Sequence, residues 1–358
     1  MVDRPVSTVR TTRARVTIGL AALGVVGAFA WWRLGPSRDA VEAGQVRWLK
    51  GQTHAHSNRS GDSDTPPEDV ARWYAAHGFD FLIFTDHDTV TSLGRVGPLL
   101  TIAGAELTQN LERCRPAEPA APHCPLHVNA LFVDRPASAS VPQDGNLERL
   151  DRYTAALQKT AALGGLAQIN HPNFHYGAAN ATLLAELSRR GARFVELANE
   201  AWDSNNQGDA THPSTEQLWD DALGLGARLF AIASDDAHHY DDAERVRSRG
   251  EDVFPGDLGF IVVRARNDPA SIRASMEHGD FYASTGVWLE TLDRAASTLT
   301  LEVRGEARFE LIGRGGKVLE QQHGQRAVFA LGTIDGYVRV RVTDANGRRA
   351  WTQPIWPS

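Results

Sequence analysis

Cysteine and methionine are both scarce in this chain, which has two of each among 358 residues. Cys114 and Cys124 lie in one proline-rich segment that reads CRPAEPAAPHC, so the paired thiolate spacing of zinc fingers is absent. Basic residues are also in deficit, because 37 Lys and Arg face 44 Asp and Glu and leave a formal net charge of −7. A chain without a basic surplus lacks the electrostatic footprint of broad nucleic-acid binding. We therefore expect no nucleic-acid partner, whereas a small anionic ligand stays compatible.

Other common signatures are missing as well. The sequence contains no GxSxG nucleophile motif, no internal repeat and no low-complexity tract. Hydrophobic residues make up 42% of the chain and charged residues 23%. This balance argues against a disordered chain and is sufficient for one large domain and a small one.

One long apolar run stands apart at the N-terminus. Residues 16–32 read VTIGLAALGVVGAFAWW, carry no charge and follow a flank with arginine at positions 4, 10, 13 and 15. The layout is typical of an export signal, with AFA at 28–30 as the cleavage site, and its length also reaches the lower limit for a membrane-spanning helix. We therefore expect residues 1–32 to be a signal peptide or membrane anchor and 33–47 to be a linker.

Export has two consequences. The rest of the chain is expected to be periplasmic or extracellular, secreted or membrane-anchored, and to meet the membrane only through the N-terminal segment if that segment is uncleaved. In an oxidising compartment Cys114 and Cys124 are expected to form a local disulfide, with two free thiols as the alternative.

From Trp48 onward, β-rich apolar segments alternate with helical patterns. The expected strands are RWLKGQT, FDFLIFT, TIAGAEL, HVNALFV, GLAQINH, ARFVELAN, RLFAIAS and LGFIVVRA. Such alternation favours parallel β-α units and predicts an α/β fold with a closed or nearly closed barrel over residues 48–291. From residue 292 apolar and polar residues alternate without helical patterns between the segments, which predicts a small antiparallel β domain over 292–358.

Histidines and acids gather where the expected strands end. They are His54 and His56, Asp86 and His87, Glu106, His171, Glu196 and Asn199, and Asp236 and His238; His127 is the exception, because it begins its expected strand. The carboxyl ends of barrel strands meet on one face, so these side chains are expected to converge. Imidazoles and carboxylates without thiolates select zinc, manganese or iron rather than calcium. A His-x-His pair can serve one ion only where its strand gives way to a loop, since strand side chains alternate in direction.

A lone histidine is more often a satisfied core or surface residue than a ligand. We apply that interpretation to His77, His123, His212, His278 and His323. His175 and His239 neighbour stronger candidates, and we expect them to support the ligands or to face the substrate.

The order of the motifs carries a family resemblance. HAH at 54–56, TDH at 85–87, GAE at 104–106, NHP at 170–172 and DAH at 236–238 resemble the successive motifs of the PHP superfamily, the polymerase and histidinol phosphatase metalloesterases. The closing DDAHH and the segment GDFYASTG at 279–286 resemble the CehA/McbA-type branch, which includes carbaryl hydrolase. The resemblance runs from about Trp48 to Leu289. It implies a distorted (β/α)7 barrel that holds two or three divalent metal ions, zinc, manganese or iron.

The resemblance also implies a ligand set. His54, His56, Glu106 and Asp236 would hold the first ion, and Glu106 would bridge to a second ion completed by His127 and His171. His87, His238 and Asp62 would hold a third ion. Asp64 is an alternative to Asp62, because the sequence reads SGDSD where the branch usually reads Ser-Asp-Gly.

An activity follows from the resemblance. Bridged ions would supply hydroxide at neutral pH and polarise a phosphoryl or carbonyl centre, so we expect a phosphoesterase that acts on a small molecule through Glu106, Asp236 and His238. A carbamate, ester or amide hydrolase is the alternative on the same site. Asn199, His239 and the turn Tyr282–Gly286 are expected to orient the substrate, although Tyr282 fits a packed barrel aromatic equally well. A non-catalytic binding module is the alternative from another class, against which the complete ligand set argues.

Overall fold

The computed structural model describes residues 44–116, 123–135, 138–173, 179–210 and 212–357. Two compact units divide the chain, residues 1–45 and 46–358, and every element named below belongs to the second. The expected signal or anchor at 1–32, most of the linker at 33–47 and His175 lie outside the described residues. Within the described ranges, no helix is long and apolar enough to cross a membrane.

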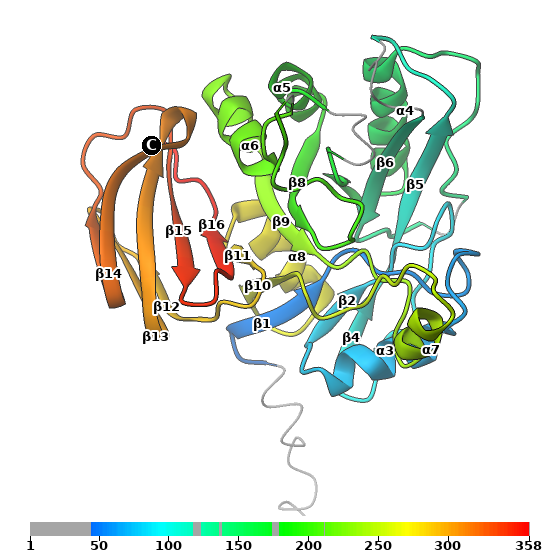
Figure 1. Cartoon of the computed structure of the whole chain (residues 1–358), viewed down its shortest axis with the longest axis horizontal. Coiled ribbons are helices and arrows are strands. Elements are labelled where there is room, and N and C mark those ends of the chain that lie inside the picture. The colour runs from blue at the N-terminus through cyan, green and yellow to red at the C-terminus, as the bar shows by residue number, and fades with distance from the viewer. Residues whose placement is uncertain (1–43, 117–122, 136–137, 174–178, 211, 358) are drawn as a thin grey trace, which may run out of the picture. The chain divides into compact units, whose positions relative to one another are not determined.

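Two β-sheets with helices packed on them form the second unit (Figure 1). The larger sheet contains, in spatial order, β12 (Leu289–Arg294), β13 (Thr298–Gly313), β15 (Val338–Asp344), β16 (Arg349–Thr352), β11 (Phe281–Ser284), β10 (Phe260–Ala265), β1 (Arg47–Gln52), β2 (Phe81–Ile83), β4 (Leu99–Ile102) and β3 (Arg95–Val96), and β14 (Lys317–Ala330) pairs with β13. The smaller sheet contains β5 (Gly104–Leu111), β6 (Cys124–Leu131), β7 (Leu166–Ile169), β8 (Ala192–Asn199) and β9 (Phe230–Ser234) in that order.

Helices pack against both sheets. The smaller sheet carries α4 (Arg149–Ala162), α5 (Ala181–Arg189) and α6 (Thr215–Gly224), and the larger one carries α3 (Pro67–Ala76) beside β4 and α8 (Pro269–His278) beside β10; the short α7 (Ala243–Ser248) follows β9. Of these helices, α8 lies in a stretch without an expected helical pattern. Its start and stop signals are nevertheless ordinary, because the side chain of Asp268 accepts a hydrogen bond from the Ser271 backbone and Gly279 ends the helix at φ 77°.

A shared apolar core lies between the two sheets. Phe81 and Ile83 of β2 belong to the same buried cluster as Phe194 of β8 and Ile232 of β9. Leu82, between the two β2 residues, points the other way and packs in the cluster that contains apolar residues of α3. A strand that is buried on both faces reads as a continuous apolar run, which is why FLI carries no alternation. The predicted mixed α/β class is confirmed.

Two isolated bridges join the sheets beyond the ends of their strands. Ala55 pairs with Ala237 after β1 and β9, and His87 pairs with Glu106 after β2. The segments that carry the candidate ligands therefore lie side by side at the carboxyl ends of β1, β2 and β9.

Strand pairing is mixed, which corrects the expected succession of parallel units. β1, β2 and β4 are parallel to one another, as are β7, β8 and β9. β6 is antiparallel to both β5 and β7, because the connection from β5 to β6 reverses the direction of the chain. Cys114 and Cys124 close this connection with the predicted disulfide.

One expected strand, TIAGAEL at 101–107, is in fact two. β4 ends at Ile102 and β5 begins at Gly104, so the chain passes from the larger sheet to the smaller one between them. Gly104 permits the crossing, because a Cβ there would lie 2.5 Å from the carbonyl oxygen of Phe84. Glu106 consequently lies near the start of β5 and not near the end of its strand.

The expected start of the next strand is also corrected. β6 begins at Cys124, three residues before His127. His127 therefore lies inside the strand, but the antiparallel direction of β6 brings its first half beside Thr108 of β5 and the end of β7. Because β6 runs in the opposite direction, His127 lies near the start of its strand and still reaches the candidate ligands that follow the ends of other strands.

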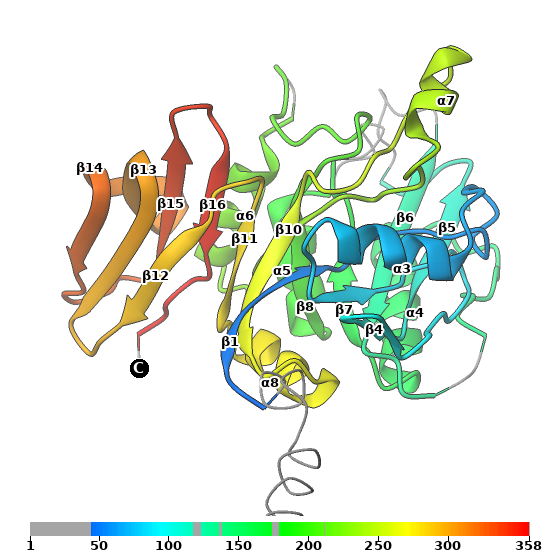
Figure 2. The same ribbon diagram turned by 90° about the horizontal axis from the view of Figure 1, so that it is seen from below.

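The C-terminal strands β12–β16 extend the larger sheet (Figure 2). They are antiparallel, as the sequence predicts, and β16 pairs with β11. The expected boundary between residues 291 and 292 falls within β12, and independent folding of 292–358 stays a prediction. Arg339 ties this segment to α6, because its fully buried guanidinium lies 2.6 Å from Asp220 and 2.7 Å from Glu216.

Candidate metal centre

The first two histidines lie where β1 ceases to be a strand. Gln52 ends β1, and its side-chain carbonyl accepts hydrogen bonds from the backbone N–H groups of Thr53 and His54. His54 and His56 are fully buried, and both place Nε2 at 3.1 Å from Asp236 Oδ1. The strand end thus allows the two imidazoles to face one carboxylate, as the His-x-His spacing requires.

Glu106 completes this group. Its carboxylate oxygens lie 3.3 Å from His54 Nε2 and 3.6 Å from His56 Nε2. Ligand atoms at the corners of a tetrahedron around an ion with bonds of 2.0–2.1 Å are about 3.3 Å apart. His54, His56 and Glu106 therefore form a group that could hold an ion, and Asp236 lies within the same distance of both imidazoles. No hydrogen bond of acceptable geometry reaches the buried His54 Nε2, although carboxylate oxygens of Glu106 and Asp236 lie within 3.3 Å of it, and a bound ion would satisfy this atom.

The same carboxylate faces three further imidazoles. Glu106 Oε1 lies 3.2 Å from His127 Nδ1 and 3.7 Å from His171 Nε2, and Oε2 lies 2.8 Å from His87 Nδ1. The amide of Asn170 donates to Oε1 at 2.7 Å and fixes its orientation. Glu106 is thus shared by two groups of donors, the geometry that a bridging ligand needs.

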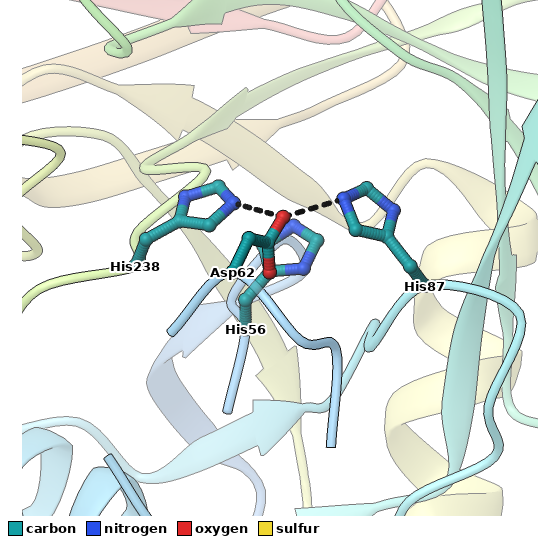
Figure 3. A group of neighbouring side chains, drawn as sticks. All are labelled: His56, Asp62, His87 and His238. Atoms are coloured by element: carbon teal, nitrogen blue, oxygen red, sulfur yellow. Dashed lines mark ion pairs between the residues drawn. The ribbon is translucent and has the colours of Figure 1, made fainter. Parts of the chain in front are cut away.

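A third group lies beside the first (Figure 3). Asp62 Oδ2 is 2.8 Å from His87 Nε2 and 3.2 Å from His238 Nε2, and the ring of His56 stacks on that of His238 with centroids 4.2 Å apart. Asp64 is exposed and belongs to none of these groups in the described part of the chain. Of the two acids that the sequence left open, Asp62 is the one at this position.

Buried partners hold the candidate ligands from behind. Glu196 accepts a hydrogen bond from His54 Nδ1 at 2.7 Å and another from the hydroxyl of Ser234 at 2.6 Å. A carboxylate behind a ligating histidine fixes its tautomer and orientation and strengthens it as a donor. The sequence analysis placed Glu196 at the right strand end without a role. Asn110, which shares a hydrogen bond with His127 Nε2 at 2.9 Å, was missed, because an asparagine inside a strand carries no signal of its own.

The backbone is strained at two of the candidate ligands. His171 has φ 23° and Asp236 has φ 54°, both on the positive side that L-residues rarely occupy. Asp236 is also held by the amide of Asn199, which donates to its Oδ2 at 3.0 Å. Such conformations persist only where the surroundings enforce them, and they concentrate at functional sites.

The close packing of buried imidazoles and carboxylates shifts the pKa values of several residues in the cluster. Burial opposes protonation of His87, yet Glu106 and Asp62 raise its pKa to about 11. Burial lowers the pKa of His56 to about 4, and the neighbouring His238 adds to that shift. Burial works against ionisation of Glu106, but the histidines around it, His127 foremost, hold its pKa well below the usual range. Ions would have to displace protons from the imidazoles, so their affinity falls at low pH.

A cavity of about 240 Å³ opens over the cluster. Its lining consists of Asp62, His87, Glu106, His127, His171, Asp203, Asp236, His238, His239 and Phe254. Three of the expected catalytic residues, Glu106, Asp236 and His238, are therefore at the cavity, and so is His239. Asp203 and Phe254 were not anticipated, because nothing in the loops that carry them forms a readable motif.

Two residues expected to orient the substrate lie outside the described lining of the cavity. Asn199 is fully buried and its amide holds Glu196 and Asp236, so it positions carboxylates and is absent from the cavity wall. Tyr282 is fully buried as well, and its hydroxyl accepts a hydrogen bond from the backbone of Leu289 while its ring meets Trp48 edge to face. Tyr282 is therefore a packed aromatic side chain, as the alternative interpretation had it.

The histidines set aside in the sequence lie elsewhere. None of His77, His123, His212, His278 and His323 belongs to a group of potential ligands among the described residues. His77 and His278 each donate to a backbone carbonyl one turn earlier in a helix, at 2.7 and 2.6 Å, which is a local structural role.

Comparison with known proteins adds only distant likenesses. No family model matches the chain. No curated protein matches it either. Among solved structures, a provisionally assigned metal-dependent phosphoesterase from Bifidobacterium adolescentis is 12% identical, with 53% of this chain and 88% of that one covered and a TM-score of 0.38. An amidohydrolase from Chromobacterium violaceum, with bound sulfate and no metal, is 16% identical over 62% of this chain and 99% of the other, with a TM-score of 0.33. Likenesses at this level decide neither fold family nor activity. The function is therefore inferred from the side chains of the site itself.

Proposed function

We propose that the chain is a metal-dependent hydrolase of the PHP superfamily, in its CehA/McbA-like branch, and that it hydrolyses phosphate esters. One observation carries the proposal: a single buried carboxylate, Glu106, lies between two groups of imidazoles at the floor of a cavity. Within the proposal, the two sheets around their shared core and the bridges between their edges form the distorted (β/α)7 barrel.

The donors divide among two or three divalent ions. His54, His56, Glu106 and Asp236 would hold the first, Glu106, His127 and His171 the second, and Asp62, His87 and His238 the third, with His56 close to both the first and the third. All donors are imidazole or carboxylate, which suits zinc, manganese or iron. When bound, such ions acidify water and polarise the centre under attack.

The charge of the cavity wall makes the proposed activity dependent on ions. Four carboxylates line the cavity, and its described lining includes neither lysine nor arginine. In the ion-free protein these carboxylates face the imidazoles of the same lining, among them His87, whose pKa Glu106 and Asp62 raise to about 11, and bound divalent ions would add the positive charge that a phosphate group requires. Divalent ions are therefore expected to strengthen the binding of a phosphate ester.

His239 supplies a hydrogen-bond donor to the cavity. Its Nδ1 accepts the backbone N–H of Phe254 at 3.1 Å, so in the neutral ring the proton resides on Nε2. Burial lowers the pKa of His239, which favours that neutral form. The Nε2–H group can donate to an oxygen of the substrate, the role expected for this residue.

A carbamate, ester or amide hydrolase is the second candidate, and the charge of the cavity lining is compatible with it. A neutral carbonyl centre requires no cationic side chain, and none is present in the described lining. Binding of such a neutral substrate should therefore depend less on divalent ions than binding of a phosphate ester.

Metal analysis followed by a substrate panel tests the proposal. Purified protein should contain two or three equivalents of zinc, manganese or iron and hydrolyse phosphate mono- or diesters. Chelation should abolish this activity and re-addition should restore it. Glu196→Gln, which weakens the support of His54 without removing a donor, should lower metal affinity about 10- to 100-fold. Protein that binds no divalent ion with all donors intact would overturn the proposal and favour a non-catalytic binding module.

A further inference from the structure

A second cavity, of about 310 Å³, lies on the larger sheet away from the metal centre. Its lining includes residues of β1 and β10 and residues of β12 and β13. In the sheet, β15, β16 and β11 separate these two pairs of strands, so the sheet must curl for both pairs to face one cavity. Trp48 of the lining lies near the start of β1, whereas the candidate ligand His54 follows the end of that strand. We call this cavity, at the opposite end of β1 from the metal centre, the sheet cavity.

Part of the lining is apolar. Leu299 and Ile355 are buried members of one hydrophobic cluster, and Trp48 and Leu292, which are partly exposed, pack against the same cluster. A concave cavity of this size with aromatic and aliphatic walls is the common form of a small-molecule site, in which a few polar groups fix the orientation of the ligand.

Two arginines occupy positions where the alternation of a strand would place apolar residues. On β10, Arg264 follows Val262 by two positions and therefore points to the same face, on which Val262 joins the buried cluster. On β12, Arg294 has the same relation to Leu292, and its partner across the strand pair is Leu299 of that cluster. Both arginines line the sheet cavity. Two separate strands thus each continue a core-facing row with a guanidinium group at the same cavity.

Neither guanidinium has a carboxylate partner. In the part of the chain that the structure describes, no Asp or Glu oxygen lies within 4 Å of Arg264 or Arg294, although Arg304 on the adjacent β13 lies 2.6 Å from Glu290. The described lining contains one carboxylate, Asp280, so with histidine counted as neutral its net charge is +1. An anion with a single charge matches this balance better than a phosphate monoester, which carries nearly two at neutral pH.

We propose that the sheet cavity binds a small carboxylate with an apolar body, an aryl- or alkyl-substituted acid, as a ligand site separate from the metal centre. The carboxylate accepts hydrogen bonds from the guanidiniums of Arg264 and Arg294, whose planar arrangement of N–H groups matches carboxylate oxygens. The apolar body covers Trp48 and Leu292 and removes their exposed surface from water. The site requires no metal ion, so it does not depend on the proposed function.

Three related compounds separate the charged part of the ligand from the apolar part. 3-Phenylpropionate has both the charge and the ring, 3-phenylpropanamide replaces the charged group by a neutral one, and acetate lacks the ring. Calorimetric titration of the full chain, both metal-loaded and after chelation, measures the dissociation constants. 3-Phenylpropionate should bind with a Kd of about 1 mM or below, and the other two compounds at least about tenfold more weakly. Binding of 3-phenylpropionate should survive chelation.

Charge variants locate the binding. Arg264→Gln and Arg294→Gln should each weaken the binding of 3-phenylpropionate by about 3- to 10-fold, and the double variant by about 10- to 100-fold. Asp280→Asn removes the one carboxylate of the described lining and should tighten binding by about two- to fivefold. Arg304→Gln is the matched control, because Arg304 is 87% exposed and does not line the cavity, and it should leave the affinity within about twofold.

Equal affinity for the acid and the amide would overturn the site, as would binding that the double arginine variant leaves unchanged. Binding that disappears on chelation would belong to the metal centre and would also overturn it, as would the absence of binding below about 10 mM. Metal content and ester hydrolysis, measured on the same preparations, decide the proposed function separately. Protein that holds no metal and hydrolyses no ester, yet binds 3-phenylpropionate through the two arginines, would refute the hydrolase and support the sheet cavity.

Discussion

Replacing Glu106 with Gln removes one negative charge from the centre of the site and keeps the shape of the side chain. The carboxylate is 1% exposed and lies within 3.3 Å of imidazole nitrogens of His54, His87 and His127. Removing one partner of a buried charge pair costs about 3–5 kcal/mol. Converted at about 1.4 kcal/mol for each tenfold, this predicts a loss of ion affinity of about 10²- to 10⁴-fold.

The fold should survive the change. Asn170 donates to Glu106 Oε1, and the amide oxygen of glutamine can accept that hydrogen bond. The new amide nitrogen would then face His87, whose ring must offer it an unprotonated nitrogen. We therefore expect native circular dichroism, metal content below that of the wild type, and hydrolysis reduced by about a hundred- to ten-thousandfold.

Two further variants grade the effect. Glu196→Gln changes a carboxylate that contacts His54 from behind, so its loss of metal should be smaller than that of Glu106→Gln. His77→Gln changes a ring that stacks on Trp73 at the end of α3, and it should leave metal and activity almost unchanged. Metal analysis and kcat/KM with the best ester are the measurements. Near-normal activity and full metal in Glu106→Gln, or an equal loss in His77→Gln, would refute the bridged-metal assignment.

Four other predictions concern stability and location. Arg339→Ala removes the arginine that pairs with the buried Asp220 of α6, while Glu216 keeps Arg341 at 3.0 Å, and it should lower the free energy of unfolding by about 3–5 kcal/mol in a denaturant titration; a loss below 1 kcal/mol, on the order of an exposed pair, would contradict this. Burial raises the pKa of Glu200 from 4.5 to about 7 and Asp235 adds to it, so the wild type should lose stability as pH rises between these values. Glu200→Gln should show no such loss and be about 3 kcal/mol more stable at pH 8; parallel pH profiles would disprove the shift. Cys114 and Cys124 should resist thiol reagents until the protein is reduced, and labelling of native protein would rule out the bridge in solution. A reporter that is active only after export, fused at Ser358, should be active if residues 1–32 direct the chain across the membrane, and a fusion that is produced but stays inactive would reject that proposal.

Residue types and their order in the chain were enough to assemble the candidate site. His54, His56, Glu106 and His171 all lie in one cluster in the structure, as their motifs predicted. Such motifs can be recognised in the sequence because an ion demands particular side chains, and the short β-rich segments before His54, His56 and His171 place these three side chains just beyond strand ends. The α/β class followed from equally local signals, and the disulfide from two cysteines in one segment of a chain expected to be exported.

The sequence could not decide which neighbouring residue turns inward. Asp62 and Asp64 are two positions apart in a loop, and only the path of that loop brings Asp62 to His87 and His238. Asn199 has a polar side chain that could bind a substrate, yet in the fold its amide donates a hydrogen bond to the carboxylate of Asp236. The direction in which a side chain points within a loop or at a strand end depends on packing against distant segments. Local sequence patterns contain no information about that packing.

Sheet organisation and the wall of the cavity were likewise decided by tertiary structure. The run TIAGAEL reads as one strand, but the close approach of Phe84 at Gly104 divides it between two sheets and sets Glu106 at the start of the second. Trp202 and Phe254 are 52 positions apart in loops without a motif, and only the folded chain brings their rings together beside His238. The sequence by itself determined which donors are present, because their chemistry is a property of each residue. Which of them meet, and what surrounds them, depends on contacts between distant segments, and only the tertiary structure determined that.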